Sequence, residues 1–328
     1  MDSRTRVERA LQLDVADRPP AAAWGHTYRE EWSPEQLARV TVARARELGW
    51  DFVKFQPRAS CFSEAFGAGW EPSGRSNKGP VLTHAAALGP SGWAGVELIN
   101  PKALDDQVRA VGLVARELGP EVPVIQTVFS PVTVAGYLAG KDEAIARRAL
   151  REQPDVIVPA LRKIAAALID FSARSVEAGA AGVFYAISGY ATKKAMPEAV
   201  YRELLMPFDR QILSALPEAA WFNVLHLCGS GIYSDLAREL PIGALSFSTH
   251  NQGNPTLAEA RERSGRAVMG GLDQRRTLMR GTADEIARQA RQAVEQTGGR
   301  GLLLAPGCSV PPMARHANLK AMMDAVAA

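Results

Sequence analysis

One histidine and two cysteines stand where two short apolar runs end, and their types suit a metal site. The stretch "NVLHLCGSG" holds His226 and Cys228 one residue apart, and "LLLAPGCSVPP" carries Cys308. Two thiolates and one imidazole match the ligand preference and the tetrahedral geometry of zinc. Three protein ligands leave a fourth position open, which is typical of a catalytic site. The three residues therefore indicate a catalytic zinc centre.

The same residues have a simpler interpretation, in which they only fill the core. Buried cysteines often act as small hydrophobic residues, and a lone histidine is commonly a hydrogen-bonded core residue. Position favours the metal, because residues two apart on a strand point to the same side. Gly229 and Gly307, which flank the ligands, would also allow tight backbone turns around a metal. Cys61 has no such partner and is expected to be a structural or loop thiol.

Eight short apolar runs recur along the chain with helical patterns between them, as in α/β proteins. Strands of a parallel sheet are covered on both faces, so they are apolar throughout. The pattern predicts a (β/α)8 TIM barrel. A doubly wound sheet is the alternative, but no strand leads into a G-x-G-x-x-G turn. The predicted strands are residues 20–25, 51–56, 122–129, 181–187, 220–227, 242–248, 265–271 and 301–306.

The predicted barrel brings the three ligands to one place. His226 and Cys228 fall at the end of the fifth strand and Cys308 just past the eighth. These strands are not neighbours, but their carboxyl ends open onto the same mouth. His316 is more typical of a helix N-terminus than of a ligand. Six further side chains at predicted mouth positions are candidates for substrate binding: His26, Gln126, Tyr185, His250, Asn251 and Asp273.

Helices are expected between the strands, and two regions interrupt the repeat. Residues 1–19 form a helix and a turn before the first strand, and residues 57–100 form a long insertion after the second, with a hairpin expected at 80–99. An insertion of this length is more often a lid or binding loop than filler. One domain is expected over residues 1–328. The helices with the clearest start and stop signals are residues 33–50, 155–180, 196–216 and 282–299.

The composition excludes several classes of protein. The 328 residues are 47% hydrophobic and 22% charged, as in soluble globular proteins, and the net charge is +3. No basic tract stands out, so nucleic acid is not an expected partner. No apolar run approaches the roughly 20 residues that span a bilayer, and the N-terminus is not a secretory signal. Three cysteines do not suit a disulfide framework, so the expected location is the cytoplasm.

Four segments resemble the uroporphyrinogen decarboxylase superfamily, and they keep its order along the chain. The resemblance covers nearly the whole sequence and implies a (β/α)8 barrel, which is usually dimeric in the decarboxylases. The segments are "RVERALQLDVADRPP", "VPVIQTVFSPVTVAGYLAG", "VMGGLDQRRTL" and "APGCSVPPMARHANLKAM".

The superfamily holds two chemistries. Its decarboxylases remove carboxyl groups from porphyrinogens without a cofactor, using an arginine-rich opening after the first strand and an aspartate after the second. Here those places are "WGHTYREEW" and "VKFQPRAS", in which Arg29 and Arg58 remain but the aspartate is not matched. The other branch comprises zinc-dependent methyltransferases with the signature His-x-Cys, a long gap, then Cys. His226, Cys228 and Cys308 match that signature in type, order and approximate spacing.

The resemblance therefore implies a zinc-dependent methyltransferase with these three residues as its ligands. A methylcobamide supplied by a corrinoid partner protein would be the donor, and a small thiol the acceptor. Coenzyme M, homocysteine and other small thiols all fit. The alternative enzyme is a decarboxylase-like lyase that acts on a tetrapyrrole or other polycarboxylate, which would need a basic, metal-free cleft. A non-catalytic barrel that binds a thiol or a corrinoid protein is the third hypothesis.

Overall fold

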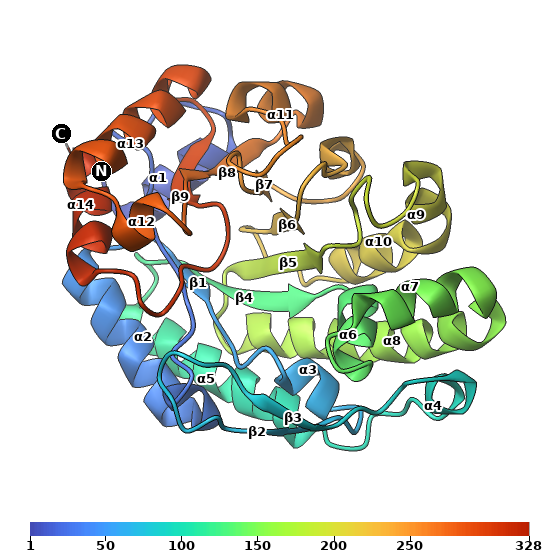
Figure 1. Cartoon of the computed structure of the whole chain (residues 1–328). Coiled ribbons are helices and arrows are strands. Elements are labelled where there is room, and N and C mark those ends of the chain that lie inside the picture. The colour runs from blue at the N-terminus through green and yellow to red at the C-terminus, as the bar shows by residue number, and fades with distance from the viewer. Residues whose placement is uncertain (328) are drawn as a thin grey trace.

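Seven parallel strands form a curled sheet at the centre of the computed structural model, which describes residues 1–327 (Figure 1). Their order in the sheet follows their order in the chain, so each strand lies beside the next one. The strands are β1 (Val53–Phe55), β4 (Val124–Phe129), β5 (Gly182–Ser188), β6 (Val224–Cys228), β7 (Ala244–Ser246), β8 (Ala267–Leu272) and β9 (Leu302–Pro306).

An extended segment around Ala21 closes the sheet into a barrel. Ala21 forms a parallel bridge with Leu304 on β9, and its carbonyl accepts a hydrogen bond from the Asp51 amide just before β1. The segment makes a bridge rather than a full strand, partly because Pro20 has no N–H to donate. Seven of the eight predicted strands are therefore present, the first predicted strand is an extended segment that bridges β9, and the predicted (β/α)8 TIM barrel is confirmed.

Helices surround the barrel, and their ends follow the predicted signals. The Ser33 side chain caps α2 by accepting from the Gln36 amide, and Gly49 ends that helix with a φ of 66°. Thr282 begins α13 with a capping box. The helices are α1 (Ser3–Leu11), α2 (Pro34–Leu48), α5 (Lys102–Leu118), α6 (Pro131–Leu138), α7 (Glu143–Glu152), α8 (Pro154–Glu177), α9 (Glu198–Leu204), α10 (Met206–Ser214), α11 (Leu257–Ser264), α12 (Thr277–Arg280), α13 (Ala283–Thr297) and α14 (His316–Ala327), with 3-10 turns η1 (Glu30–Trp32) and η2 (Ser234–Arg238).

Two local predictions were wrong. Residues 196–216 form two helices, α9 and α10, because Pro207 cannot donate a backbone hydrogen bond to the preceding turn. The hairpin expected within residues 80–99 pairs further upstream: β3 (Val81–His84) is antiparallel to β2 (Gly69–Glu71). Residues 90–94 instead form the short helix α4 (Pro90–Ala94), which begins at a proline, a residue favoured in the first turn.

The long insertion after β1 forms a layer at one side of the barrel (Figure 1). It contains the short helix α3 (Cys61–Glu64), the β2–β3 hairpin and α4. Trp93 and Phe62 are fully buried beneath it, and the Trp70 indole donates to Ser63 Oγ at 3.0 Å. The insertion is therefore anchored to the hydrophobic core by its aromatic side chains.

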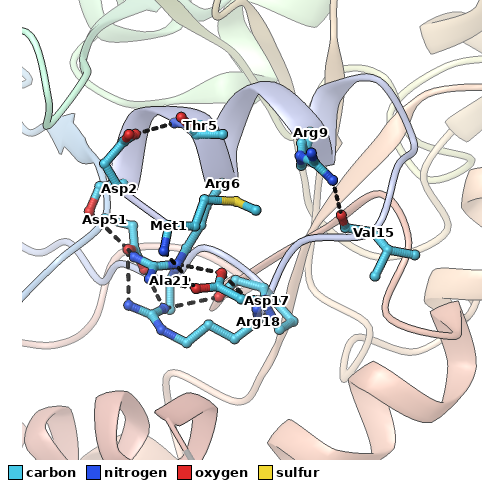
Figure 2. A network of polar contacts seen from close by, with 12 residues as sticks. Met1, Asp2, Thr5, Arg6, Arg9, Val15, Asp17, Arg18, Ala21 and Asp51 are labelled. Carbon is cyan, nitrogen blue, oxygen red and sulfur yellow. Dashed lines mark hydrogen bonds and ion pairs between the residues drawn. The ribbon is translucent and has the colours of Figure 1, made fainter.

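A buried carboxylate attaches the N-terminal helix to the end of the barrel that lies opposite the mouth. Asp51, which precedes β1, accepts hydrogen bonds from Arg6 at 3.0 Å, from Arg18 at 2.6 Å and from the Ala21 amide at 2.9 Å (Figure 2). Ser3 Oγ adds a fourth at 3.0 Å. Each carboxylate oxygen has both a charged and a neutral donor, as a buried charge requires.

None of the helices within residues 1–327 has the length and apolar character needed to span a bilayer.

Candidate metal centre

Strand β6 aims His226 and Cys228 into the barrel. Their neighbours in register are Ala186 and Ser188 on β5, and His226 is also level with Ser246 on β7. Cys308 follows β9 and reaches the same point from across the mouth. One ligand atom from each of the three residues lies within 4.8 Å of the other two, although 80 positions separate the cysteines. The predicted convergence of the three side chains is confirmed.

The spacing of the sulfur atoms suits zinc. Cys228 Sγ and Cys308 Sγ are 4.0 Å apart. Two thiolates on one tetrahedral zinc, each at roughly 2.3 Å from the metal, stand about 3.8 Å apart. The donor set of one imidazole and two thiolates fits the same ion. These residues could therefore hold zinc with little rearrangement.

His226 is fixed by groups behind it. Its Nδ1 lies 3.1 Å from Ser246 Oγ, and its ring stacks on Phe184 with centroids 5.0 Å apart. When Nδ1 carries the proton and donates to the serine, Nε2 presents its lone pair for a metal. Such hydrogen bonds behind a ligating histidine fix its tautomer and its orientation.

The two glycines expected beside the ligands are both required by the backbone. Gly229 has a φ of 126°, which side-chain-bearing residues rarely adopt. At Gly307, an added Cβ would lie 2.5 Å from the Cα of Ser248, so only glycine allows the β7 and β9 loops to approach. Asn251 and Asn254 both donate to the Gly229 carbonyl at 2.9 Å and hold the β6 loop in place.

The two thiols perturb one another. The hydrogen bond from the Cys228 thiol lowers the pKa of Cys308 well below its usual range, and His226 adds to that effect. The same contact and burial raise the pKa of Cys228, which the charge of Arg275 partly offsets. The Cys308 sulfur is thus ready to bind a cation. Metal binding would release the proton that remains on Cys228.

Four of the six candidate substrate-binding residues lie at the mouth. His26 Nδ1 is 2.7 Å from Glu31 Oε1, and His250 Nε2 is 3.1 Å from the Gly271 carbonyl. Asn251 is engaged with the β6 loop as described above. Asp273 accepts hydrogen bonds from the amides of the two arginines that follow it. Among them, His250 and Asp273 line an open cavity, so these two are accessible to a ligand.

Gln126 and Tyr185 do not lie where they were expected. Tyr185 is fully buried on the outer face of β5, where its hydroxyl donates to Asp209 on α10 at 2.7 Å. Gln126 points outward from β4, and its amide donates weakly to the Gln107 carbonyl of α5 at 3.4 Å. Neighbouring residues on a strand alternate between faces, and both residues fall on the face that packs against helices.

The remaining thiol and histidine behave as expected. Cys61 is fully buried in α3, and burial raises its pKa well above the usual range. His316 begins α14 and pairs with Glu47 at 3.2 Å on the surface. Neither residue contributes to the metal centre.

The sequence interpretation missed a buried lysine in the barrel. Lys54 on β1 is 5% exposed, its Nζ donates to Gln56 Oε1 at 2.5 Å, and it stands 4.7 Å from the centre of the Phe184 ring. Burial lowers the pKa of Lys54 to about 7. The available signal was a pair of polar residues two apart, Lys54 and Gln56, which the two-residue period of a strand places on the same face.

A second missed feature is a basic cavity of about 700 Å³ beside the mouth. Asp273 and Glu285 also line it, but Asp273 is occupied by backbone amides and Glu285 by the capping box of α13. Within residues 1–327, none of its arginines forms an ion pair, so the cavity is suited to anions. Its arginines are Arg275, Arg276, Arg280 and Arg288.

A (β/α)8 barrel with a histidine and two cysteines converging at its mouth defines an enzyme scaffold with a candidate metal centre. The chain belongs to the uroporphyrinogen decarboxylase (URO-D) family, whose model matches residues 5–328.

Named relatives include both chemistries of that family. The chain is 28% identical to the methylcobamide:CoM methyltransferase MtaA of Methanosarcina barkeri (strain Fusaro), over 98% of this chain and 96% of the relative. It is 25% identical to the uroporphyrinogen decarboxylase of Geobacter sp. (strain M21), over 90% and 85%. Among solved structures, a methyltransferase from Methanosarcina mazei superposes with a TM-score of 0.81 at 22% identity, covering 100% of this chain and 98% of that one, which supports the fold.

Proposed function

We propose that this chain is a zinc-dependent methyltransferase that moves a methyl group from a corrinoid to a thiol. The observation that carries the proposal is the convergence of His226, Cys228 and Cys308 at the barrel mouth, with sulfur atoms 4.0 Å apart. That donor set provides three ligands and leaves room for a fourth, as in catalytic zinc sites.

The chemistry requires a thiol to react as its thiolate. A free thiol has a pKa of about 8.5 and is mostly protonated at neutral pH. Zinc, when bound, would favour the deprotonated form of a thiol placed beside it. The barrel orients the three candidate ligands: Ser246 fixes the His226 ring, and the β6 and β9 loops fix the two cysteines. In the transfer, a carbon–sulfur bond forms, the carbon–cobalt bond breaks and its electron pair stays on cobalt.

The basic cavity supports an acceptor that carries a negative charge. Its four arginines have no carboxylate partners among the described residues, and the charge of Arg275 reaches Cys228. Coenzyme M, after which the methylcobamide:CoM methyltransferase relatives are named, is a thiol with an anionic group. For the donor, we propose a methylcobamide carried by a separate corrinoid protein that docks at the open mouth.

The decarboxylase alternative has less support from the site. Arg58, one of the two arginines that remain from the decarboxylase pattern, is bound to Glu64 at 2.7 Å and to the Glu31 carbonyl at 2.9 Å. Its guanidinium is therefore not free to bind substrate carboxylates. The aspartate that the decarboxylase pattern has at this point is also not matched in the sequence after β1.

The test begins with metal analysis of protein purified without chelators. We expect about one zinc per chain, and Cys228→Ala and Cys308→Ala should each lose it. Cys61→Ala is the matched control, since that thiol is buried away from the centre, and it should keep the metal. The zinc-loaded protein should then transfer the methyl group of methylcobalamin to at least one thiol of a panel containing 2-mercaptoethanesulfonate, 3-mercaptopropionate and homocysteine.

Two results would contradict the proposal. One is a metal-free protein whose three cysteines can all be titrated and that shows no methyl transfer. The other is stepwise loss of carboxyl groups from uroporphyrinogen, followed by chromatography, which would support the lyase instead.

A further inference from the structure

The amine of Lys54 lies inside the barrel, and within residues 1–327 it forms no direct ion pair. Among residues 1–327, Gln56 is its hydrogen-bond partner, at 2.5 Å, and no carboxylate lies within ion-pair distance of Nζ. An ammonium has three donors, and burying one with a single partner is costly. The aromatic faces of Phe184 and Trp24, at 4.7 and 5.8 Å from Nζ, compensate only partly. An anion bound beside it would complete its surroundings.

Gln56 holds this amine at a fixed point next to the metal centre. Its Oε1 accepts from Lys54 and also from Ser309 Oγ, at 3.3 Å, and Ser309 directly follows Cys308. Its Nε2 lies 3.2 Å from His26 Nε2, and His26 in turn donates from Nδ1 to Glu31. Both the oxygen and the nitrogen of the Gln56 amide therefore have partners, which fixes its orientation and directs its oxygen at the lysine.

The lysine also borders the centre through the barrel core. Lys54 Nζ lies over the Phe184 ring. The His226 ring stacks on that same phenylalanine, with ring centroids 5.0 Å apart. The charges of Glu31 on η1 and Cys308 after β9 act on Lys54, and His26 is connected to it through Gln56. Glu31 is itself buried, and its Oε2 has no hydrogen-bond partner.

We propose that Lys54 accepts the proton that the acceptor thiol loses when it binds, an inference that rests on the proposed methyltransferase function. The sulfur–hydrogen bond of the thiol breaks and a nitrogen–hydrogen bond forms on Lys54. No atom is oxidised or reduced in this step. The product is a thiolate beside a buried ammonium, so the net charge of the site does not change. After methyl transfer the thioether carries no charge, and the ammonium returns its proton to solvent.

The charge state of the free lysine agrees with this role. Burial lowers its pKa to about 7, so at slightly alkaline pH a large share of the amines is neutral and able to take a proton. An ordinary lysine would be fully protonated there and could only supply charge.

The test is the number of protons released when a thiol binds to the zinc-loaded, full-length chain. The thiol is the best methyl acceptor of the panel described above that remains protonated up to pH 8. Calorimetry in buffers of different ionisation enthalpy gives the count. At pH 6 Lys54 already carries its proton, so about one proton should be released. At pH 8 the neutral lysine should take it, and the release should fall to about 0.1 proton.

Variants separate proton acceptance from a structural or purely electrostatic role. Lys54→Met and Lys54→Arg cannot accept a proton in this range, so each should release about one proton at both pH values. Lys102→Met, an exposed position on α5, should behave like the unmodified chain. Release of one proton at both pH values by the unmodified chain would overturn the inference, even if neither Lys54 variant folds. The absence of zinc or of any turned-over thiol would instead overturn the proposed function.

Discussion

Replacing Lys54 by methionine should make the stability of the protein depend less on pH. The two side chains are similar in length, so methionine can fill the space beside Phe184 without burying an amine. In the folded chain the pKa of Lys54 is lowered to about 7 by burial, against an ordinary value of 10.5. Each pKa unit corresponds to about 1.4 kcal/mol, so burial of this amine costs about 5 kcal/mol when it must be charged.

The direction of the effect follows from proton binding. Between pH 7 and 10.5 the unfolded chain holds the proton on Lys54 and the folded chain does not, so stability rises with pH through this window. Below pH 7 the amine is protonated in both states, and the full cost is present. From pH 6 to pH 9 the unmodified chain should therefore gain roughly 2 to 3 kcal/mol relative to Lys54→Met.

Urea denaturation at pH 6, 7.5 and 9, with both proteins at the same metal content, measures this difference. Packing changes caused by the methionine shift all three values alike, so they cancel in the comparison between pH values. Lys102→Met, whose side chain is 76% exposed, is the control and should show no such trend. A stability difference between Lys54→Met and the unmodified chain that is constant from pH 6 to 9 would show that the amine titrates normally.

Two further predictions concern other charges. Asp51→Asn should lower the free energy of unfolding by about 3 kcal/mol or more at pH 7, because Arg6 and Arg18 lose the buried carboxylate between them (Figure 2); a loss below about 1 kcal/mol in urea denaturation would refute that assignment. Arg275→Gln should raise the KM for 3-mercaptopropionate about two- to fivefold, as removal of an exposed ion pair does, and leave the KM for neutral 2-mercaptoethanol unchanged. Equal changes in KM for the two thiols would show that the cavity does not distinguish an anionic thiol from a neutral one.

The barrel and the convergence of the three candidate metal ligands could be predicted because the signals are local. Short apolar runs, N-cap residues and glycine stops each constrain one element, and strand-end positions in a barrel share one mouth. The two-residue period of a strand was sufficient to predict that His226 and Cys228 point to the same side. To place Cys308 beside them, the sheet also had to close into a barrel, and the eight apolar runs in the sequence already implied that closure.

The inner and outer faces of the strands could not be read from the sequence in the same way. β4 and β5 are buried on both sides, so their residues are apolar on each face and give no alternation. Tyr185 and Gln126 were assigned to the mouth on polarity alone. A shift of one residue reverses the face of a side chain, and only the contacts with α5 and α10 decide between them.

Two buried ionisable groups in this barrel have opposite signs and different surroundings. Asp209, on the outer side of β5, accepts hydrogen bonds from the hydroxyls of Tyr185 and Tyr201 at 2.7 and 2.6 Å, and burial still raises its pKa to about 7. Its cost falls as the pH drops below 7, whereas the cost of Lys54 falls as the pH rises above 7. Near neutral pH both costs are close to their maximum.

The two groups differ in what offsets that cost. Both oxygens of Asp209 are satisfied between the sheet and the helices, by Tyr185 on β5 and Tyr201 on α9, so this carboxylate serves packing on the outer side of the barrel. Within residues 1–327, Lys54 has one side-chain hydrogen bond, to Gln56, and the charge of Cys308 acts on it. Buried charges that the fold leaves incompletely satisfied are typical of functional sites rather than of structural ones. The incomplete surroundings of Lys54 are therefore an argument that its partner is the substrate.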